Sequence, residues 1–388
     1  MVSGSYLAAF AALLVVAAAD AAEHQHGPSQ GVRSLDVCAS DGIIDVLTGE
    51  SREGSEKPQL FHTRSTDGGE TWSTPIRVDA GMPSGYSLHR GMDAQVAGAG
   101  DNLIAVWTTA GTDQWGSGPM ATALSSDAGK TWRAGPNPAD DGSTTGHGFI
   151  DIAADSAGKF HLTWLDSRDG RQGLRYARSI DSGKTWSPNQ TVKAATCECC
   201  TNTLATGPDG NVAILFRDGD PRDMGVVLAR DGGQRWLAAT RVGDFRWQFN
   251  GCPHVGGGLA FTEAVLHAIV WSGMTEHVGV HYLASLDDGS TWSQPHRLGS
   301  ATASHPDIAT DLDQRVAAVW DERSDKGSVI WSSKSGDGGR SWSEPAQLSQ
   351  NGSSPTHPRI VATSAGFRAF WTESPNEGSA TWRSVRIP

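Results

Sequence analysis

One eight-residue motif recurs six times along the chain and constrains the fold more than any other feature. The copies are STDGGETW (65–72), SSDAGKTW (125–132), SIDSGKTW (179–186), ARDGGQRW (229–236), SLDDGSTW (285–292) and SGDGGRSW (335–342). Successive copies lie 50 to 60 residues apart. A period near 50 residues with one turn signal in each repeat is typical of sheets arranged radially around an axis. The sequence therefore predicts an all-β propeller built from repeated blades.

Each copy of the motif has the composition of a tight turn at the end of a strand. An aspartate side chain can accept hydrogen bonds from nearby amides, and glycine adopts backbone angles that other residues avoid. Alternating runs such as GLRYARS (173–179) precede the motif, and this alternation indicates a strand. The motif resembles the Asp-box, or BNR, repeat of the sialidase superfamily, whose pattern is S-x-D-x-G-x-T-W. The resemblance implies that the six boxes are structural turns that lie away from an active site.

The number of blades follows from the short strands that begin each repeat. Seven such inner strands are recognisable, at residues 34–40, 93–98, 149–155, 202–207, 252–258, 305–311 and 357–364. We therefore predict one propeller domain over residues 22–388, with seven four-stranded antiparallel blades and six Asp-box turns. An N-terminal strand near residues 26–32 would complete the last blade. Six blades, as in ordinary sialidases, is the alternative.

Residues 1–21 have the features of a secretory signal peptide. The apolar run 7–19 is short for a membrane span, and Ala19-Asp20-Ala21 fits the small-x-small cleavage pattern. We therefore expect a secreted or periplasmic chain that starts at Ala22, has no membrane span and is a monomer. The formal net charge of −12 argues against nonspecific binding to nucleic acid.

Polar side chains gather on one side of the predicted ring. We call this side the mouth face; there the inner strands begin and the second strands end, while the Asp boxes lie on the opposite face. Carboxylates that end the second strands could serve as catalytic acid and base, and the candidates are Asp166, Asp218, Asp321 and Glu373. Guanidinium groups on this face could bind a substrate carboxylate, and the candidates are Arg33, Arg52, Arg90, Arg168, Arg217 and Arg323.

The resemblance to sialidases implies three arginines that clamp the substrate, a Tyr–Glu nucleophile pair and an aspartate acid/base. Arg33 and Arg52 stand where two of those arginines would be, although the Ile-Pro that should follow Arg33 is missing. Tyr86, Tyr176 and Tyr282 do not stand in the context of the nucleophile. We therefore expect little or no release of sialic acid. Three function classes stay open: a glycan-directed hydrolase, a copper-handling or redox protein, and a noncatalytic propeller that binds a glycan, small molecule or partner.

Four of the five cysteines lie in CECC (197–200) and GCPH (251–254), which open neighbouring blades. In an exported protein we expect a disulfide between the CECC loop and Cys252. Reduced thiols together with imidazole would instead suit Cu(I) or Zn(II). The candidate ligands are Cys197, Cys199, Cys200, Cys252 and His254, with His147 and His305 from flanking blades. Cys38 is expected to be a buried free thiol.

The mature N-terminus offers a second candidate copper site. Cleavage after Ala21 leaves Ala22-Glu23-His24, in which a free amine, two backbone nitrogens and the His24 imidazole could chelate Cu(II) in a square plane.

Overall fold

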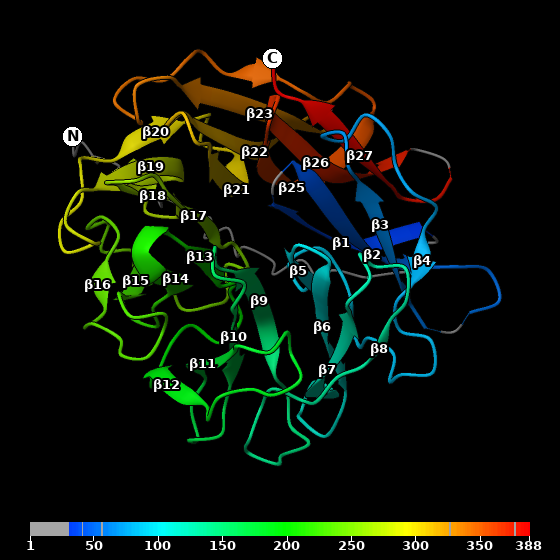
Figure 1. Ribbon diagram of the computed structural model, residues 1–388. Helices are drawn as coiled ribbons and strands as arrows, with labels where there is room; N and C mark the ends of the chain where they lie inside the picture. The colour runs from blue at the N-terminus through cyan, green and yellow to red at the C-terminus, as the bar shows by residue number, and fades with distance from the viewer. Residues whose placement is uncertain (1–30, 41, 56, 326, 376–377) are drawn as a thin grey trace, which may run out of the picture.

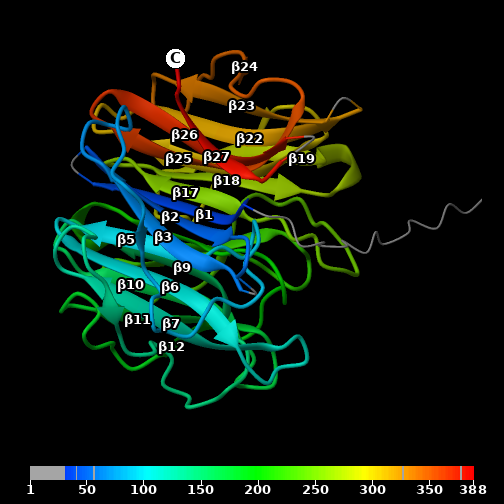
Figure 2. The same ribbon diagram turned by 90° about the vertical axis from the view of Figure 1, so that its right-hand side faces the viewer.

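Seven small antiparallel sheets stand in a ring around a central channel in the computed structural model of the chain (Figure 1). The structure describes residues 31–40, 42–55, 57–325, 327–375 and 378–388. Inner strands of neighbouring blades contact one another all around the ring, and the last one contacts the first. Figure 2 shows the ring from the side. The seven-bladed prediction is confirmed, and the six-bladed alternative is wrong.

The first four blades run through residue 241. Their strands are β1 (Gly31–Ser40), β2 (Ile43–Ser51), β3 (Gln59–Ser65) and β4 (Ile76–Arg77); β5 (Gln95–Ala99), β6 (Asn102–Ala110), β7 (Ser117–Ser125) and β8 (Arg133–Ala134); β9 (Gly148–Ala154), β10 (Phe160–Asp166), β11 (Gly173–Ser179) and β12 (Gln190–Lys193); and β13 (Thr203–Thr206), β14 (Val212–Arg217), β15 (Met224–Ala229) and β16 (Thr240–Arg241). A short 3₁₀ helix, η1 (Pro208–Gly210), joins β13 to β14.

The last three blades complete the ring. Their strands are β17 (Gly257–Phe261), β18 (Leu266–Ser272), β19 (Gly279–Ser285) and β20 (His296–Leu298); β21 (Ala303–Thr310), β22 (Val316–Ser324), β23 (Gly327–Ser335) and β24 (Ala346–Gln347); and β25 (Ser353–Thr363), β26 (Gly366–Pro375) and β27 (Thr381–Arg386). A second 3₁₀ helix, η2 (Thr275–His277), lies between β18 and β19. No helix in the described ranges is long and apolar enough to cross a membrane.

The start of the chain meets the last blade. Gly31 forms a parallel bridge with Ala380, and the Val32 amide donates to the Ala380 carbonyl at 2.9 Å. Of the predicted closing strand near residues 26–32, only Gly31 and Val32 lie within the described residues, and both make this contact. The signal peptide and His24 lie outside them.

The second strand of each blade is buried because neighbouring blades cover both of its faces. Every residue of β10 is buried, and Trp107, Trp164 and Trp320 on β6, β10 and β22 have no exposed surface. Burial of such a large apolar side chain stabilises the packing of one blade on the next. The core is thus a series of layers between blades, which is why the whole ring must close to bury it.

The Asp boxes are self-contained turns. In the first box, the Asp67 carboxylate accepts the Thr71 amide at 2.9 Å and the Thr71 hydroxyl at 2.6 Å, while the Ser65 hydroxyl accepts the Gly69 amide at 2.8 Å. Because these hydrogen bonds favour the charged form, they hold the pKa of Asp67 well below its usual range. The aspartates of the boxes are therefore committed to the turn itself.

One glycine of an Asp box packs closely against the neighbouring blade. Gly339 has a φ of +87° and lies against the hydroxyl of Tyr282, which would overlap a Cβ atom at this position. That hydroxyl is fixed at 2.7 Å from Nδ1 of His267. Gly338, beside it, has a similar φ of +72° but nothing within 4 Å of the position of a Cβ.

We expect Gly339→Ala to lower the free energy of unfolding by about 2–4 kcal/mol, because steric overlap adds to the strain of a positive φ. Gly338→Ala should cost only about 1–2 kcal/mol, since it introduces the strain alone. Urea denaturation of both variants measures the difference. Equal effects of the two substitutions would show that the Tyr282 contact does not matter.

Candidate functional site

The mouth face carries the two large aromatic side chains that are exposed among the described residues. Trp115, in the loop between β6 and β7, is 75% exposed, and Phe249, in the loop between β16 and β17, is 45% exposed. Phe249 stacks on Trp247, with ring centroids 5.1 Å apart and planes inclined by 10°. The large exposed aliphatic side chains lie in turns on the Asp-box face, and they are Ile180, Leu237, Leu286 and Leu312.

Asp166 lies at the mouth end of β10 within a dense hydrogen-bond network. Its carboxylate accepts bonds from Arg168 at 2.7 Å, from Trp164 at 2.8 Å and from Arg175 at 2.9 Å. Burial by itself would raise the pKa of Asp166, but these three donors outweigh burial and lower it. A carboxyl that stays ionised and saturated with donors is a poor general acid.

The predicted ligand His147 joins this network rather than the cysteines. Its Nε2 lies 3.2 Å from an oxygen of Asp141 and 3.9 Å from an oxygen of Asp166. These three side chains are one of the groups whose potential ligand atoms lie within 4.8 Å of one another.

The predicted His305 likewise belongs to its own group, with Asp321 and His357. Nδ1 of His305 lies 2.8 Å from the Asp321 carboxylate, which also accepts the His357 amide at 2.9 Å. The two imidazoles stack with centroids 3.6 Å apart. Burial, followed by the nearby His305 and Arg90, lowers the pKa of His357 well below its usual range. The structure therefore does not bring His147 and His305 to the cysteines in one site.

The two other predicted acids are also paired with basic side chains. Glu373 accepts bonds from Arg383 at 2.7 Å and from Trp371 at 3.0 Å. Burial would raise the pKa of Glu373, but these donors lower it. Asp218 lies 3.5 Å from the ammonium group of Lys193.

The six predicted arginines have three different placements. Arg90 and Arg217 lie inside the fold: Arg90 donates to the carbonyls of Leu35 and His357 and to Asp93, and Arg217 donates to main-chain carbonyls. Arg168 binds Asp166, as described above. Arg33 is partly buried at a bulge in β1, Arg52 pairs with Glu50 at 2.8 Å, and Arg323 is exposed near the end of β22. Only this last group leaves guanidinium surface at the mouth.

The three tyrosines are bonded to groups other than glutamate. Tyr176 and Tyr282 lie between blades and are hydrogen-bonded to His161 at 2.6 Å and His267 at 2.7 Å, while Tyr86 donates to the Trp115 carbonyl. Burial raises the pKa of both Tyr176 and Tyr282, so neither is poised as a nucleophile.

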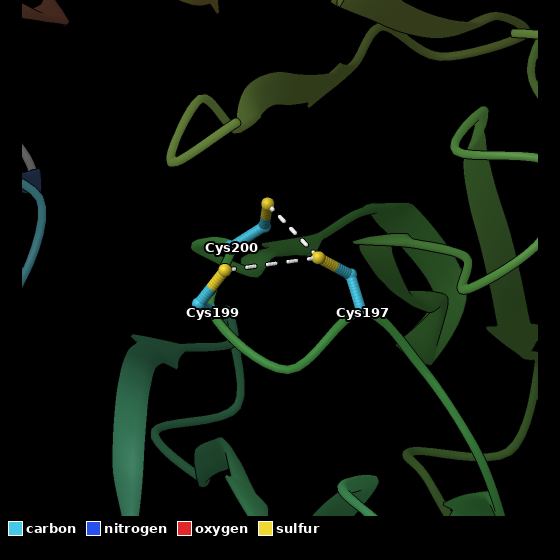
Figure 3. Close-up of side chains that lie close together, drawn as sticks. All are labelled: Cys197, Cys199 and Cys200. Atoms are coloured by element: carbon cyan, nitrogen blue, oxygen red, sulfur yellow. Dashed lines mark hydrogen bonds between the residues drawn. The ribbon is translucent and has the colours of Figure 1, made fainter. Parts of the chain in front are cut away.

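Four cysteines meet on the mouth side of blades 4 and 5. Cys199 and Cys252 form a disulfide with Cα atoms 6.1 Å apart, which confirms the predicted bridge. The sulfur of Cys197 lies 3.3 Å from that of Cys200 and 4.0 Å from that of Cys199, and Figure 3 marks both contacts with dashed lines. The hydrogen bond between the two free thiols lowers the pKa of Cys197 to about 6 and raises that of Cys200. Cys38 is also free, but it is only partly buried.

Equivalent positions of the inner strands place charged side chains in the channel. Asp36 on β1, Asp151 on β9 and Asp307 on β21 each accept the amide of a residue on the next inner strand, at 2.8, 2.6 and 3.1 Å. Arg359 on β25 lies among them, with a nitrogen 3.5 Å from Asp36. These four residues line a cavity of about 730 Å³ that includes the inner-strand turns of the Asp-box face. Towards the mouth, a cavity lined by Tyr86 and Arg359 has only about 20 Å³.

This charged ring is absent from the residues selected by sequence. The usable signal is an acidic or basic residue before a β-branched residue in the segments SLDV, FIDI, HPDI and HPRI. Aligning the inner strands by this pattern would have placed all four side chains at one level of the channel.

The chain belongs to the family of BNR repeat-like domains, because the sequence pattern of that family matches residues 43–262. The resemblance to the sialidase superfamily is thereby confirmed. A protein named "Sialidase" from Bacteroides fragilis (strain YCH46) is 25% identical over 308 residues, which are 66% of this chain and 52% of that protein. The chain thus spans about half the length of this curated relative.

Solved structures with very different sequences share the fold. A PL25 ulvan lyase superposes with a TM-score of 0.59 at 12% identity, over 91% of this chain and 93% of the lyase. The NanB sialidase from Streptococcus pneumoniae gives 0.51 at 10% identity, over 92% of this chain and 69% of NanB.

Proposed function

We propose that this propeller binds an extended glycan on its mouth face. The observation that carries the proposal is the placement of the exposed aromatic rings Trp115 and Phe249 on this face, away from the Asp boxes. The flat apolar face of a sugar ring can pack on an exposed aromatic side chain. The exposed guanidinium groups of Arg52 and Arg323 on the same face can donate hydrogen bonds to hydroxyl or acidic substituents. The sialidase and the ulvan lyase named above support the glycan as ligand class.

The small size of the cavity towards the mouth favours a polysaccharide over a single sugar as the ligand. A cavity of about 20 Å³ towards the mouth holds no more than one water molecule. Sugar residues would therefore lie across the surface loops, where the exposed rings stand.

Binding without hydrolysis agrees with the state of the predicted acids. Asp166 and Glu373 are ionised and saturated with donors, as described above. The tyrosine hydroxyls are used inside the fold or by a carbonyl. Asp166 and Glu373 therefore hold the mouth face together, and the hydroxyls of Tyr176 and Tyr282 serve the packing between blades.

The proposed function also includes export of the chain from the cytoplasm. The leader over residues 1–21 and the disulfide between Cys199 and Cys252 both suit an oxidising compartment, where an extracellular glycan is accessible. N-terminal sequencing of the exported chain checks the expected start at Ala22.

Affinity electrophoresis through gels that contain a panel of neutral and acidic polysaccharides tests the binding. We expect retardation by at least one polysaccharide, and about a tenfold loss of affinity in Trp115→Ala, since an aromatic contact contributes about 0.5–1.5 kcal/mol beyond its buried area. Leu312→Ala is the matched control, because it removes a 99% exposed apolar side chain from the Asp-box face. Absence of retardation throughout the panel, or equal affinity of Trp115→Ala and wild type, would refute the proposal.

A further inference from the structure

Two buried free thiols lie side by side beneath the mouth face. Cys197 and Cys200 belong to the loop between β12 and β13; each is 1% exposed, and their sulfurs are 3.3 Å apart. Figure 3 shows the two sulfurs joined by a dashed line that marks their hydrogen bond. Cys199, between them in sequence, is bonded to Cys252 and is not available as a thiolate. The pair is thus a preformed two-sulfur site rather than part of a larger cluster of reduced thiols.

A buried cation lies near the same sulfurs. Arg217 is 1% exposed, and its guanidinium donates to the carbonyls of Val255 at 2.9 Å and Trp271 at 3.0 Å. Within the part of the chain that the structure describes, no carboxylate oxygen lies within 4.0 Å of its nitrogens. Burying a charge without a counter-charge is costly, so a structure that keeps one this deep needs an anion nearby. Burial lowers the pKa of Arg217, and the neighbouring Cys200, Cys197 and Asp223 oppose this shift.

We propose that Cys197 and Cys200 bind one monovalent soft metal ion of the Cu(I) class as a thiolate pair. Thiolates select Cu(I) over hard cations. Two thiolates and one monovalent ion carry a net charge of −1, which the guanidinium of Arg217 neutralises. The thiol protons pass to solvent on binding, and neither the sulfurs nor the ion changes oxidation state.

The same charge balance disfavours zinc at this site. Two thiolates and Zn²⁺ are neutral together and would add no negative charge beside Arg217, which would then have, among the described residues, only the more distant Asp223 as an acidic neighbour. Structural Zn²⁺ also requires four ligands, whereas the disulfide removes Cys199 and Cys252 from the donor set.

Titration of the full exported chain with Cu(I) against a chromophoric competing chelator tests the proposal. We expect one equivalent to bind with the Cys199–Cys252 disulfide intact, and each of Cys197→Ser and Cys200→Ser to weaken binding at least 100-fold. Cys38→Ser is the matched control, since it removes the other free thiol and should leave the affinity unchanged. Ag(I), which does not change oxidation state, should give the same pattern.

Several results would refute the proposed Cu(I) site. One is Cu(I) affinity that survives both substitutions, which would place the ion elsewhere, such as at the N-terminal histidines. Another is a chain whose Cys197 and Cys200 are joined in a disulfide and that fails to bind Cu(I) after mild reduction. Equal occupancy by Zn(II) under competition would also refute it. If the serine variants do not fold, X-ray absorption of the Cu(I)-loaded wild type still decides, because two sulfur ligands are expected and a nitrogen-only shell contradicts the proposal.

Discussion

Replacing Arg359 with methionine is expected to lower the free energy of unfolding by about 2–4 kcal/mol at neutral pH. Arg359 lies on the inner strand of the last blade, and its charge is stabilised by Asp36, Asp307 and Asp151, although burial works against it. Removing one partner of a buried ion pair typically costs 3–5 kcal/mol, because the remaining charge is left without compensation. The loss expected for Arg359→Met is somewhat smaller than this typical range, because the side chain of Arg359 is 28% exposed to the channel.

Chemical denaturation of the purified chain at pH 7 measures this effect. Arg359→Lys should recover much of the loss because it keeps the charge, and Arg323→Met should be nearly neutral because Arg323 is exposed. A variant that fails to fold at pH 7 should fold better at pH 5, where the carboxyls around position 359 become protonated. A loss below about 0.5 kcal/mol at pH 7 would show that Arg359 does not hold the ring of carboxylates together.

The sequence predicts the propeller because its signals are local and repeated. Each Asp box contains all the hydrogen-bonding groups of its own turn, as Asp67 and Thr71 show, so eight residues suffice to recognise it. The blade count rests on seven similar inner strands, and the structure confirms it. The closing strand is only partly tested, since of residues 26–32 the structure describes Gly31 and Val32.

The candidate site was less predictable because its partners come from distant segments. The sequence places Asp166 on the mouth face, but it does not reveal that Arg175 from the next strand binds the carboxylate. The charged ring is the extreme case, since Asp36 and Arg359 are more than 300 residues apart and meet only when the ring closes. The sequence predicts a disulfide between the CECC loop and Cys252, but it does not show which of the three loop cysteines forms it. Packing in the folded chain selects Cys199.

A second large effect is expected in the pH dependence of stability. Burial raises the pKa of Asp36 from 3.8 to about 6, although Arg359 and the Val96 amide oppose the shift. The folded state therefore binds a proton in a pH range where the unfolded state has released it. Stability from this group is fully present below about pH 4 and is lost as the pH rises through 6. A shift of this size corresponds to about 3 kcal/mol, and Asp36 is only 6% exposed.

The buried histidines act in the opposite direction over part of the same window. Burial lowers the pKa of His267 and of His281 to about 4, so these groups destabilise the fold as the pH falls below their unfolded value near 6.5. The total pH profile is thus a balance of opposing groups. The contribution of Asp36 is isolated by the difference between wild type and a variant that lacks the carboxyl.

Asp36→Asn removes the titrating group but keeps an oxygen that can accept the Val96 amide, which now bonds the carboxylate at 2.8 Å. We expect the stability of Asp36→Asn relative to wild type to rise by about 2–3 kcal/mol between pH 4 and pH 7, because only wild type must ionise a buried carboxyl. Asp101→Asn is the control; its carboxyl is 77% exposed, and its profile should run parallel to that of wild type. Urea denaturation at half-unit steps of pH measures all three curves. If Asp36→Asn also runs parallel to wild type, the carboxyl is ionised in the folded channel at every pH above 4, and the channel is more strongly solvated than its lining indicates.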